Sequence, residues 1–123
     1  MQLPSKELLS EVLADIYNPR IVEWMEVEDN YLRTYYDCGR YDDQGRPTGL
    51  GIEINIYELA NKCKEWILAE GYSFFSYSDD NSEWYAQCKL VTTDIQPLTW
   101  SVADTEPDAV FEAAEWVRQQ KEC

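Results

Sequence analysis

The sequence predicts one α+β domain over residues 1–123, with three helices packed on an antiparallel sheet of about five strands. Three segments carry apolar residues at helical spacing, and the segments between them are rich in the β-branched and aromatic residues that favour strands. Short polar turns divide these strand-like segments into pairs, which is typical of antiparallel hairpins. The expected order is therefore α-β-β-loop-α-β-β-β-α.

The first helix is expected to begin at Ser5, because a serine hydroxyl can accept hydrogen bonds from the free N–H groups of a first turn. Its apolar face recurs at i, i+3, i+4 and i+7 and consists of Leu9, Val12, Leu13 and Ile16. Proline disfavours helix at the residue before it, so the helix should end near Asn18-Pro19.

The next segments read as a hairpin and a loop. The strands Ile21–Val27 and Tyr31–Tyr36 are separated by the polar turn Glu28-Asp29-Asn30. The segment Gly39–Gly51 has four glycines, one proline and no periodicity of either kind. It is expected to form a loop of about a dozen residues, a length that often marks a functional or mobile segment.

The middle helix has the clearest boundaries in the sequence. Asn55 followed by Glu58 is close to a capping box, and Gly71 is the expected left-handed terminator. The apolar face between them consists of Ile56, Leu59, Ala60, Cys63 and Ile67. On that face Cys63 is interpreted as a small core residue and not as a nucleophile.

A second hairpin and a last helix complete the pattern. The strand-like segments are Tyr72–Tyr77, Glu83–Val91 and, after Pro97, Leu98–Ala103. The helix starts at Asp104-Thr105-Glu106-Pro107, where a capping residue, an early proline and acidic side chains suit a helix N-terminus. Ala113 and Ala114 belong to a small-residue face that would let this helix lie close against the sheet.

The charge is strongly negative, since 10 Lys and Arg against 24 Asp and Glu give a net charge of −14. Such a field repels phosphate backbones and anionic lipids, so neither direct nucleic-acid binding nor membrane binding is expected. No apolar run approaches the roughly eighteen residues of a membrane span, and the N-terminus lacks a signal-peptide pattern. The four cysteines are far apart and are interpreted as reduced thiols, so a cytoplasmic location is expected.

The residue types needed for common catalytic sites are missing. The chain has no His, which excludes Ser-His-Asp and Cys-His designs, and it has no phosphate-binding glycine loop. The acidic groups Asp42-Asp43 and Asp79-Asp80-Asn81 lack the spacing of a calcium loop and are typical of solvated turns. We therefore expect no catalytic residues, no metal and no cofactor, and we interpret the protein as a binding protein and not an enzyme.

Two segments resemble a known group of proteins. The run Ala103–Trp116 resembles the C-terminal element, and Asn55–Gly71 the middle helix, of the small bacteriophage and prophage proteins grouped as phage ABA-sandwich proteins. The resemblance covers about the C-terminal half of the chain. It implies a phage or prophage origin and a sheet covered by helices, and it implies no reaction or ligand.

Charge and aromatic side chains remain as candidates for a partner-binding site. On the last helix three carboxylates fall at i, i+4 and i+7, while the first hairpin mixes acidic and aromatic residues as protein interfaces do. The candidates are Glu23, Trp24, Glu26, Tyr35, Asp108, Glu112 and Glu115. The leading hypothesis is a phage-type accessory protein that binds a partner with a basic surface, for example to inhibit a host nucleic-acid-handling or defence enzyme. The alternative is a homo-oligomeric accessory protein whose acidity only keeps the assembly in solution.

Overall fold

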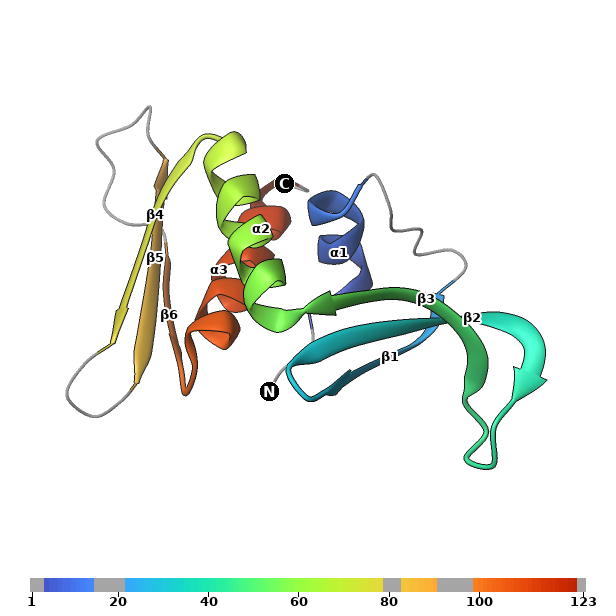
Figure 1. The fold of residues 1–123 in the computed structure, drawn as a ribbon. Helices are drawn as coiled ribbons and strands as arrows, with labels where there is room; N and C mark the ends of the chain where they lie inside the picture. Colours follow the sequence, from blue (N-terminus) through green and yellow to red (C-terminus); the bar gives the residue numbers. More distant parts are fainter. Residues whose placement is uncertain (1–3, 15–21, 79–82, 91–98, 122–123) are drawn as a thin grey trace. The chain divides into compact units, whose positions relative to one another are not determined.

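A computed structural model describes residues 4–14, 22–78, 83–90 and 99–121 (Figure 1). In these residues the elements are α1 (Lys6–Val12), β1 (Val22–Glu28), β2 (Tyr31–Tyr41), β3 (Pro47–Asn55), α2 (Ile56–Ala69), β4 (Tyr72–Ser78), β5 (Trp84–Leu90), β6 (Thr99–Ala103) and α3 (Glu106–Lys121). The α+β class, the three helices and the antiparallel pairing are confirmed. A single sheet of about five strands is not, because the described strands form two three-stranded sheets, β1-β2-β3 and β4-β5-β6.

The chain divides into two compact units. The N-terminal unit is Ser5–Leu59, and the C-terminal unit is Ala60–Cys123 together with Met1–Pro4. Each unit contains one of the two sheets. The units are therefore treated one at a time.

Helix α1 begins as its sequence indicates. The Ser5 hydroxyl accepts a hydrogen bond from the Leu8 amide at 3.0 Å, so Ser5 is confirmed as the cap. Leu8, Leu9 and Leu13 are buried. The helix ends at Val12, with Leu13 as its C-cap, so the prediction that it continues to near Asn18-Pro19 is wrong.

Strands β1 and β2 form the predicted hairpin with a two-residue turn. Asp29 and Asn30 have φ angles of 52° and 65°, the left-handed conformation that both central residues of a type I′ turn require. Asp and Asn tolerate this conformation better than most residues because their short polar side chains bond to nearby backbone. The turn sets Glu28 opposite Tyr31, and the register of the hairpin follows from that pair.

The prediction of a loop over Gly39–Gly51 is wrong, because most of this segment is strand. β2 continues to Tyr41, a tight turn follows, and β3 begins at Pro47. The register shift between Tyr36 and Tyr41 places four residues of β2 opposite one residue of β3. Such an irregularity removes the alternation by which a strand is recognised in a sequence.

A side chain of β2 forms hydrogen bonds with the backbone of a bulge in β3. Arg33 lies opposite Glu53 and Tyr35 opposite Leu50, so one extra residue of β3 faces the intervening Thr34. The Thr34 hydroxyl accepts from the Ile52 amide at 2.7 Å and lies 3.3 Å from the Ile52 carbonyl oxygen, to which it can donate. Thr34 is only 1% exposed, so this buried hydroxyl bonds the backbone groups that the bulge takes out of the ladder.

Arg33 links all three strands of the same sheet. It stands on the central strand β2, and its guanidinium pairs with Glu28 of β1 at 3.2 Å and with Glu53 of β3 at 2.8 Å. One cation therefore balances carboxylates on both edge strands.

Helix α2 has the predicted cap and terminator. The Asn55 side-chain oxygen accepts from the amides of Tyr57 at 2.8 Å and Glu58 at 3.4 Å. Gly71 ends the helix with a φ of 93°, a conformation that glycine adopts without a Cβ clash. The predicted apolar face is buried throughout and consists of Ile56, Leu59, Ala60, Cys63 and Ile67.

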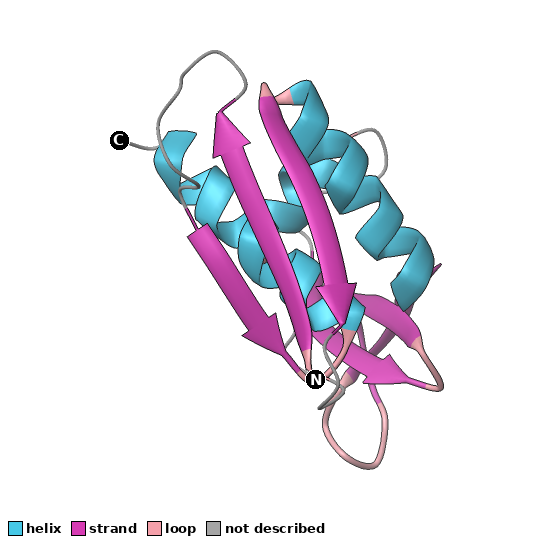
Figure 2. Ribbon diagram, turned by 90° about the vertical axis from the view of Figure 1, so that its left-hand side faces the viewer, coloured by secondary structure: helices cyan, strands magenta, loops and turns pink. Residues whose placement is uncertain are grey.

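In the C-terminal unit one face of the sheet is covered by helix. Helix α3 packs on β4, β5 and β6, and Figure 2 shows these three strands in front of α3. The predicted inward face of α3 is confirmed, since Ala113 and Ala114 are both 0% exposed. The Thr105 hydroxyl caps the helix by accepting from the Asp108 amide at 3.3 Å.

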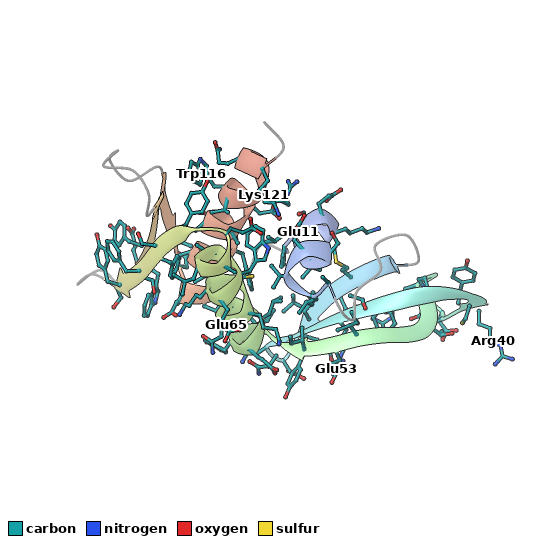
Figure 3. All side chains as sticks on the ribbon, turned by 90° about the horizontal axis from the view of Figure 1, so that it is seen from above. Glu11, Arg40, Glu53, Glu65, Trp116 and Lys121 are labelled. Carbon is teal, nitrogen blue, oxygen red and sulfur yellow. The ribbon has the colours of Figure 1, made fainter. Side chains whose placement is uncertain are left out.

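Helix α3 contacts its neighbours in this unit through aromatic and charged side chains. Trp116, labelled in Figure 3, meets the Tyr72 ring of β4 edge-to-face with centroids 5.9 Å apart. Lys121 lies 5.6 Å from the centre of the Trp66 ring of α2 and pairs with Glu70, the residue after α2, at 3.1 Å. These contacts fix α3 against the sheet and against α2 from residue 60 onward.

Candidate functional site

A cluster of four side chains joins β1, β2 and the turn before β3. Glu26 accepts from the Tyr35 hydroxyl at 2.9 Å and pairs with Arg46 at 2.5 Å. Arg46 also pairs with Asp42 at 2.5 Å, and its guanidinium carbon lies 5.5 Å from the centre of the Tyr35 ring. We call Glu26, Tyr35, Asp42 and Arg46 the Arg46 cluster.

Two of the predicted partner-binding residues, Glu26 and Tyr35, bond to other residues of the chain in the Arg46 cluster. Both carboxylate oxygens of Glu26 are bonded, and partial burial together with the bond to Glu26 raises the pKa of Tyr35. Glu23 and Trp24 belong to β1, where the register makes Glu23 the extra residue of a bulge, while their side chains lie outside what the structure describes. The proposed interface role of these four residues stays a prediction.

Asp42 holds the turn of the Arg46 cluster together. One carboxylate oxygen accepts from the amides of Gln44 at 2.9 Å and Arg46 at 3.0 Å. Partial burial of Asp42 opposes ionisation, but these amides and the Arg46 guanidinium outweigh it and lower the pKa below the usual 3.8.

The turn is therefore expected to loosen in acid. A lowered pKa in the folded state means that the stabilisation is present above the usual value of 3.8 and is lost as the pH falls through the folded pKa. The Gln44 and Arg46 amides should then show faster hydrogen exchange and shifted resonances in a pH titration by NMR. Asp42→Asn should abolish this dependence, and its persistence in that variant would contradict the assignment to Asp42.

The predicted acidic row lies on the outer side of α3. Glu112 is exposed, and Asp108 and Glu115 are half-buried, whereas the helix positions between them face the core. Glu115 pairs with Arg118 at 3.0 Å. Of the three carboxylates, Glu115 is thus partly neutralised within the helix.

Asp108 and Glu112 form the less balanced part of this row. Partial burial and the nearby Asp108 carboxylate raise the pKa of Glu112, which shows that the two like charges repel each other. Within the described residues no cation pairs with either group, and one Asp108 oxygen is buried there without a hydrogen-bond donor. The carboxylates of Asp108 and Glu112 can therefore accept a cation from outside the chain.

A row of aromatic side chains occupies the face of the β4–β6 sheet opposite to α3. Phe75 and Tyr77 alternate with inward residues of β4, and Tyr85 lies opposite Tyr77 on β5. The rings are nearly parallel, with centroids 6.1 Å apart for Phe75 and Tyr77 and 5.1 Å apart for Tyr77 and Tyr85. We call Phe75, Tyr77 and Tyr85 the aromatic row.

The aromatic row was not among the predicted site residues. Two signals in the sequence indicate it. The run from Tyr72 to Tyr77 places Phe75 and Tyr77 two residues apart, on one face of a strand. An antiparallel hairpin between the predicted strands then brings Tyr77 near Tyr85, although only the observed register fixes that pair.

Cys38 and Cys63, the two cysteines whose side chains the structure describes, differ in environment. Cys63 is fully buried, and burial raises the pKa of its thiol to about 12, in keeping with the predicted core role. Cys38 is exposed, and a hydrogen bond with the Thr48 hydroxyl together with the Arg40 backbone lowers the pKa of its thiol. Both are free thiols.

Two further features, a metal-binding cluster and a membrane-spanning helix, are absent from the described residues. They contain no group of three or more His, Cys, Asp or Glu side chains placed to hold a metal ion. No helix among them combines the length and the apolar character needed to cross a membrane.

Comparison of the chain with protein-family models, with curated proteins and with solved structures found no match. The resemblance to phage ABA-sandwich proteins therefore stays a prediction from the two sequence segments.

Proposed function

We propose that this protein acts by binding another protein through an acidic surface and that it has no catalytic activity of its own. The observation that carries the proposal is the excess of carboxylates. Even if each of the 10 cations neutralised one of the 24 acidic groups, 24 − 10 = 14 carboxylates would remain without a counter-charge from the chain. A basic partner surface would supply it and would be steered toward the protein.

The distribution of the ion pairs supports the same proposal. Arg33 and Arg46 each pair with two carboxylates, so these two cations are already engaged inside the N-terminal unit. On α3 Glu112 is exposed beside the half-buried Asp108, and partial burial together with the Asp108 charge raises the pKa of Glu112. A partner cation placed between them would relieve their repulsion, so binding there gains more than at an already paired carboxylate.

The proposal includes a biological setting. The segments Asn55–Gly71 and Ala103–Trp116 resemble phage and prophage proteins, which favours an accessory protein acting in the cytoplasm of a bacterial host. A host enzyme that handles nucleic acid has a basic groove, and a folded polyanion can compete for such a groove without binding nucleic acid itself. Inhibition of such an enzyme, or of a defence enzyme, is the form of binding that we favour.

A capture experiment from bacterial lysate tests the proposal. The immobilised protein should retain partners with a basic surface at low salt and release them at high salt, since screening weakens contacts between exposed charges. The variant Asp108→Asn/Glu112→Gln should release them at a lower salt concentration than the wild type. Glu115→Gln is the matched control, because that carboxylate already pairs with Arg118.

The same variants separate binding from folding. Each substitution on this face is expected to change the free energy of unfolding by no more than about 0.5 kcal/mol. Because its pKa is raised, Glu112 favours folding less as the pH rises, so Glu112→Gln should not destabilise the protein at neutral pH. Capture that is insensitive to salt, or no capture at low salt, would refute a charge-driven interaction.

A further inference from the structure

We propose that the aromatic row docks an arginine-bearing segment of the partner protein. The inference rests on the proposed function and gives it a place in the fold and a chemical class of ligand. It is carried by three observations. Two belong to the C-terminal unit, namely exposed rings in a fixed geometry and a negative charge. The third is a form of cation recognition that both units of the chain use.

The aromatic row presents apolar surface to solvent. The Phe75 side chain is 50% exposed and Tyr77 is 42% exposed, although aromatic residues bury the most area when they are covered. Their backbones are fixed by a continuous register from Tyr72 to Ser78, and the near-parallel rings support one another. A surface that is already ordered loses little conformational entropy when a ligand binds to it.

The charge around the aromatic row favours a cationic ligand. Residues 60–123 contain 5 Lys and Arg and 12 Asp and Glu, so this part of the chain has a net charge of 5 − 12 = −7. A carboxylate lies beside the row itself, since the Tyr85 hydroxyl donates to Glu83 at 3.2 Å. Ring faces also carry the negative part of the aromatic quadrupole, which attracts cations.

The chain holds its own cations with the same two components. In the Arg46 cluster a guanidinium lies over the Tyr35 ring and pairs with Glu26, and on α3 an ammonium lies over the Trp66 ring and pairs with Glu70. Each site combines an aromatic ring with carboxylate, two carboxylates in the Arg46 cluster and one beside Lys121. The aromatic row brings ring and carboxylate together on an exposed sheet face, with Glu83 beside Tyr85.

Arginine suits this surface better than lysine or a second copy of the chain. The guanidinium is planar, so it can stack flat on a ring while two of its N–H groups bond to a carboxylate, whereas a lysine ammonium, such as that of Lys121 over Trp66, acts as a point charge. A second copy would bring a further charge of −14 against the same face, and this repulsion disfavours a dimer. The complementary ligand is therefore a segment of another protein that carries arginine.

Two peptides of equal charge test the inference. An oligo-arginine and an oligo-lysine peptide of about nine residues, each fluorescently labelled, are titrated with the intact protein at about 0.15 M and about 0.5 M salt. The wild type should bind the arginine peptide about tenfold more tightly, which corresponds to roughly two cation–π contacts. The preference should persist at the higher salt, where general charge attraction is screened.

Variants then locate the preference. Phe75→Thr/Tyr77→Thr keeps strand-favouring side chains and should remove the preference for arginine, whereas Tyr77→Phe should retain it. The control is Tyr41→Thr, since Tyr41 is an aromatic strand residue of the N-terminal unit with a similar exposure of 56%. If the double variant fails to fold, the single variant Tyr77→Thr against Tyr77→Phe makes the same comparison.

The outcomes separate this inference from the proposed function. Equal binding of both peptides by the wild type, or an arginine preference that survives in the double variant, overturns the aromatic row as the site and leaves acidic binding intact. No binding of either peptide at low salt overturns both. A wild-type dimer that the double variant dissociates, seen by sedimentation, would overturn the inference by identifying a second copy as the occupant.

Discussion

Replacing Thr34 with Val is expected to lower the free energy of unfolding by about 1–3 kcal/mol. The shape of the side chain is kept, but the hydroxyl that bonds the Ile52 amide and carbonyl in the bulge of β3 is lost. Because Thr34 is buried, water cannot easily replace it, and an unbonded buried backbone group costs about 1–3 kcal/mol. Urea denaturation followed by circular dichroism measures the loss.

Two further variants test the explanation for Thr34. Thr34→Ser retains the hydroxyl and should recover most of the lost stability, apart from the roughly 0.8 kcal/mol of one methyl group. Thr48→Val removes an exposed threonine hydroxyl of the same strand pair and should cost less than about 0.5 kcal/mol. A Thr34→Val protein as stable as the wild type would show that the bulge does not need this side chain.

Replacing Ala113 with Leu is expected to cost about 1–3 kcal/mol through overpacking. Ala113 is 0% exposed on the face of α3 that packs on the sheet, between Ala109 and Val117 in the same stripe. The larger side chain must push the helix from the strands or adopt an unfavourable rotamer. The melting temperature of the variant should fall by several degrees.

A matched substitution at an exposed position of α3 controls for helix propensity. Gln120 is exposed near the end of the helix, so Gln120→Leu adds the same side chain where there is room for it. Its melting temperature should stay close to that of the wild type. If Ala113→Leu and Gln120→Leu behaved alike, the small-residue face would not be packed as the structure has it.

The sequence predicts the helices better than the sheets, for reasons that particular residues show. Ser5 and Asn55 cap helices and Gly71 ends one, each through contacts within a few residues of its own position. These roles can therefore be predicted without tertiary structure. The faces of α3 also follow from local spacing, which places Ala113 inside and Glu112 outside. Helix caps and helix faces depend on neighbours in the chain.

The strand β3 was missed because its signals depend on a partner strand. Pro47, Gly49 and Gly51 read as a loop in isolation, and the bulge opposite Thr34 interrupts the alternation of the strand. Pairing with β2 overrides these local preferences. The number of sheets likewise depends on which strands meet, and no local pattern separates β1–β3 from β4–β6.

The candidate site was predictable in its parts and not in its contacts. The sequence identifies Glu26 and Tyr35 as acidic and aromatic members of a hairpin, but their contact with Arg46 crosses a segment that reads as a loop. The aromatic row depends on the pairing of Tyr77 with Tyr85, which is a property of register. Contacts between residues distant in sequence need the fold itself.

The bridging position of Arg33 has a consequence for mutational tolerance. One cation on the central strand serves Glu28 and Glu53 on the two edge strands, so its loss would leave two carboxylates unbalanced in one sheet. Loss of a surface carboxylate instead removes one charge from a chain with a net charge of −14 and relieves repulsion. Among substitutions that arise by drift, the chain should thus accept the loss of negative charges more readily than the loss of its few arginines.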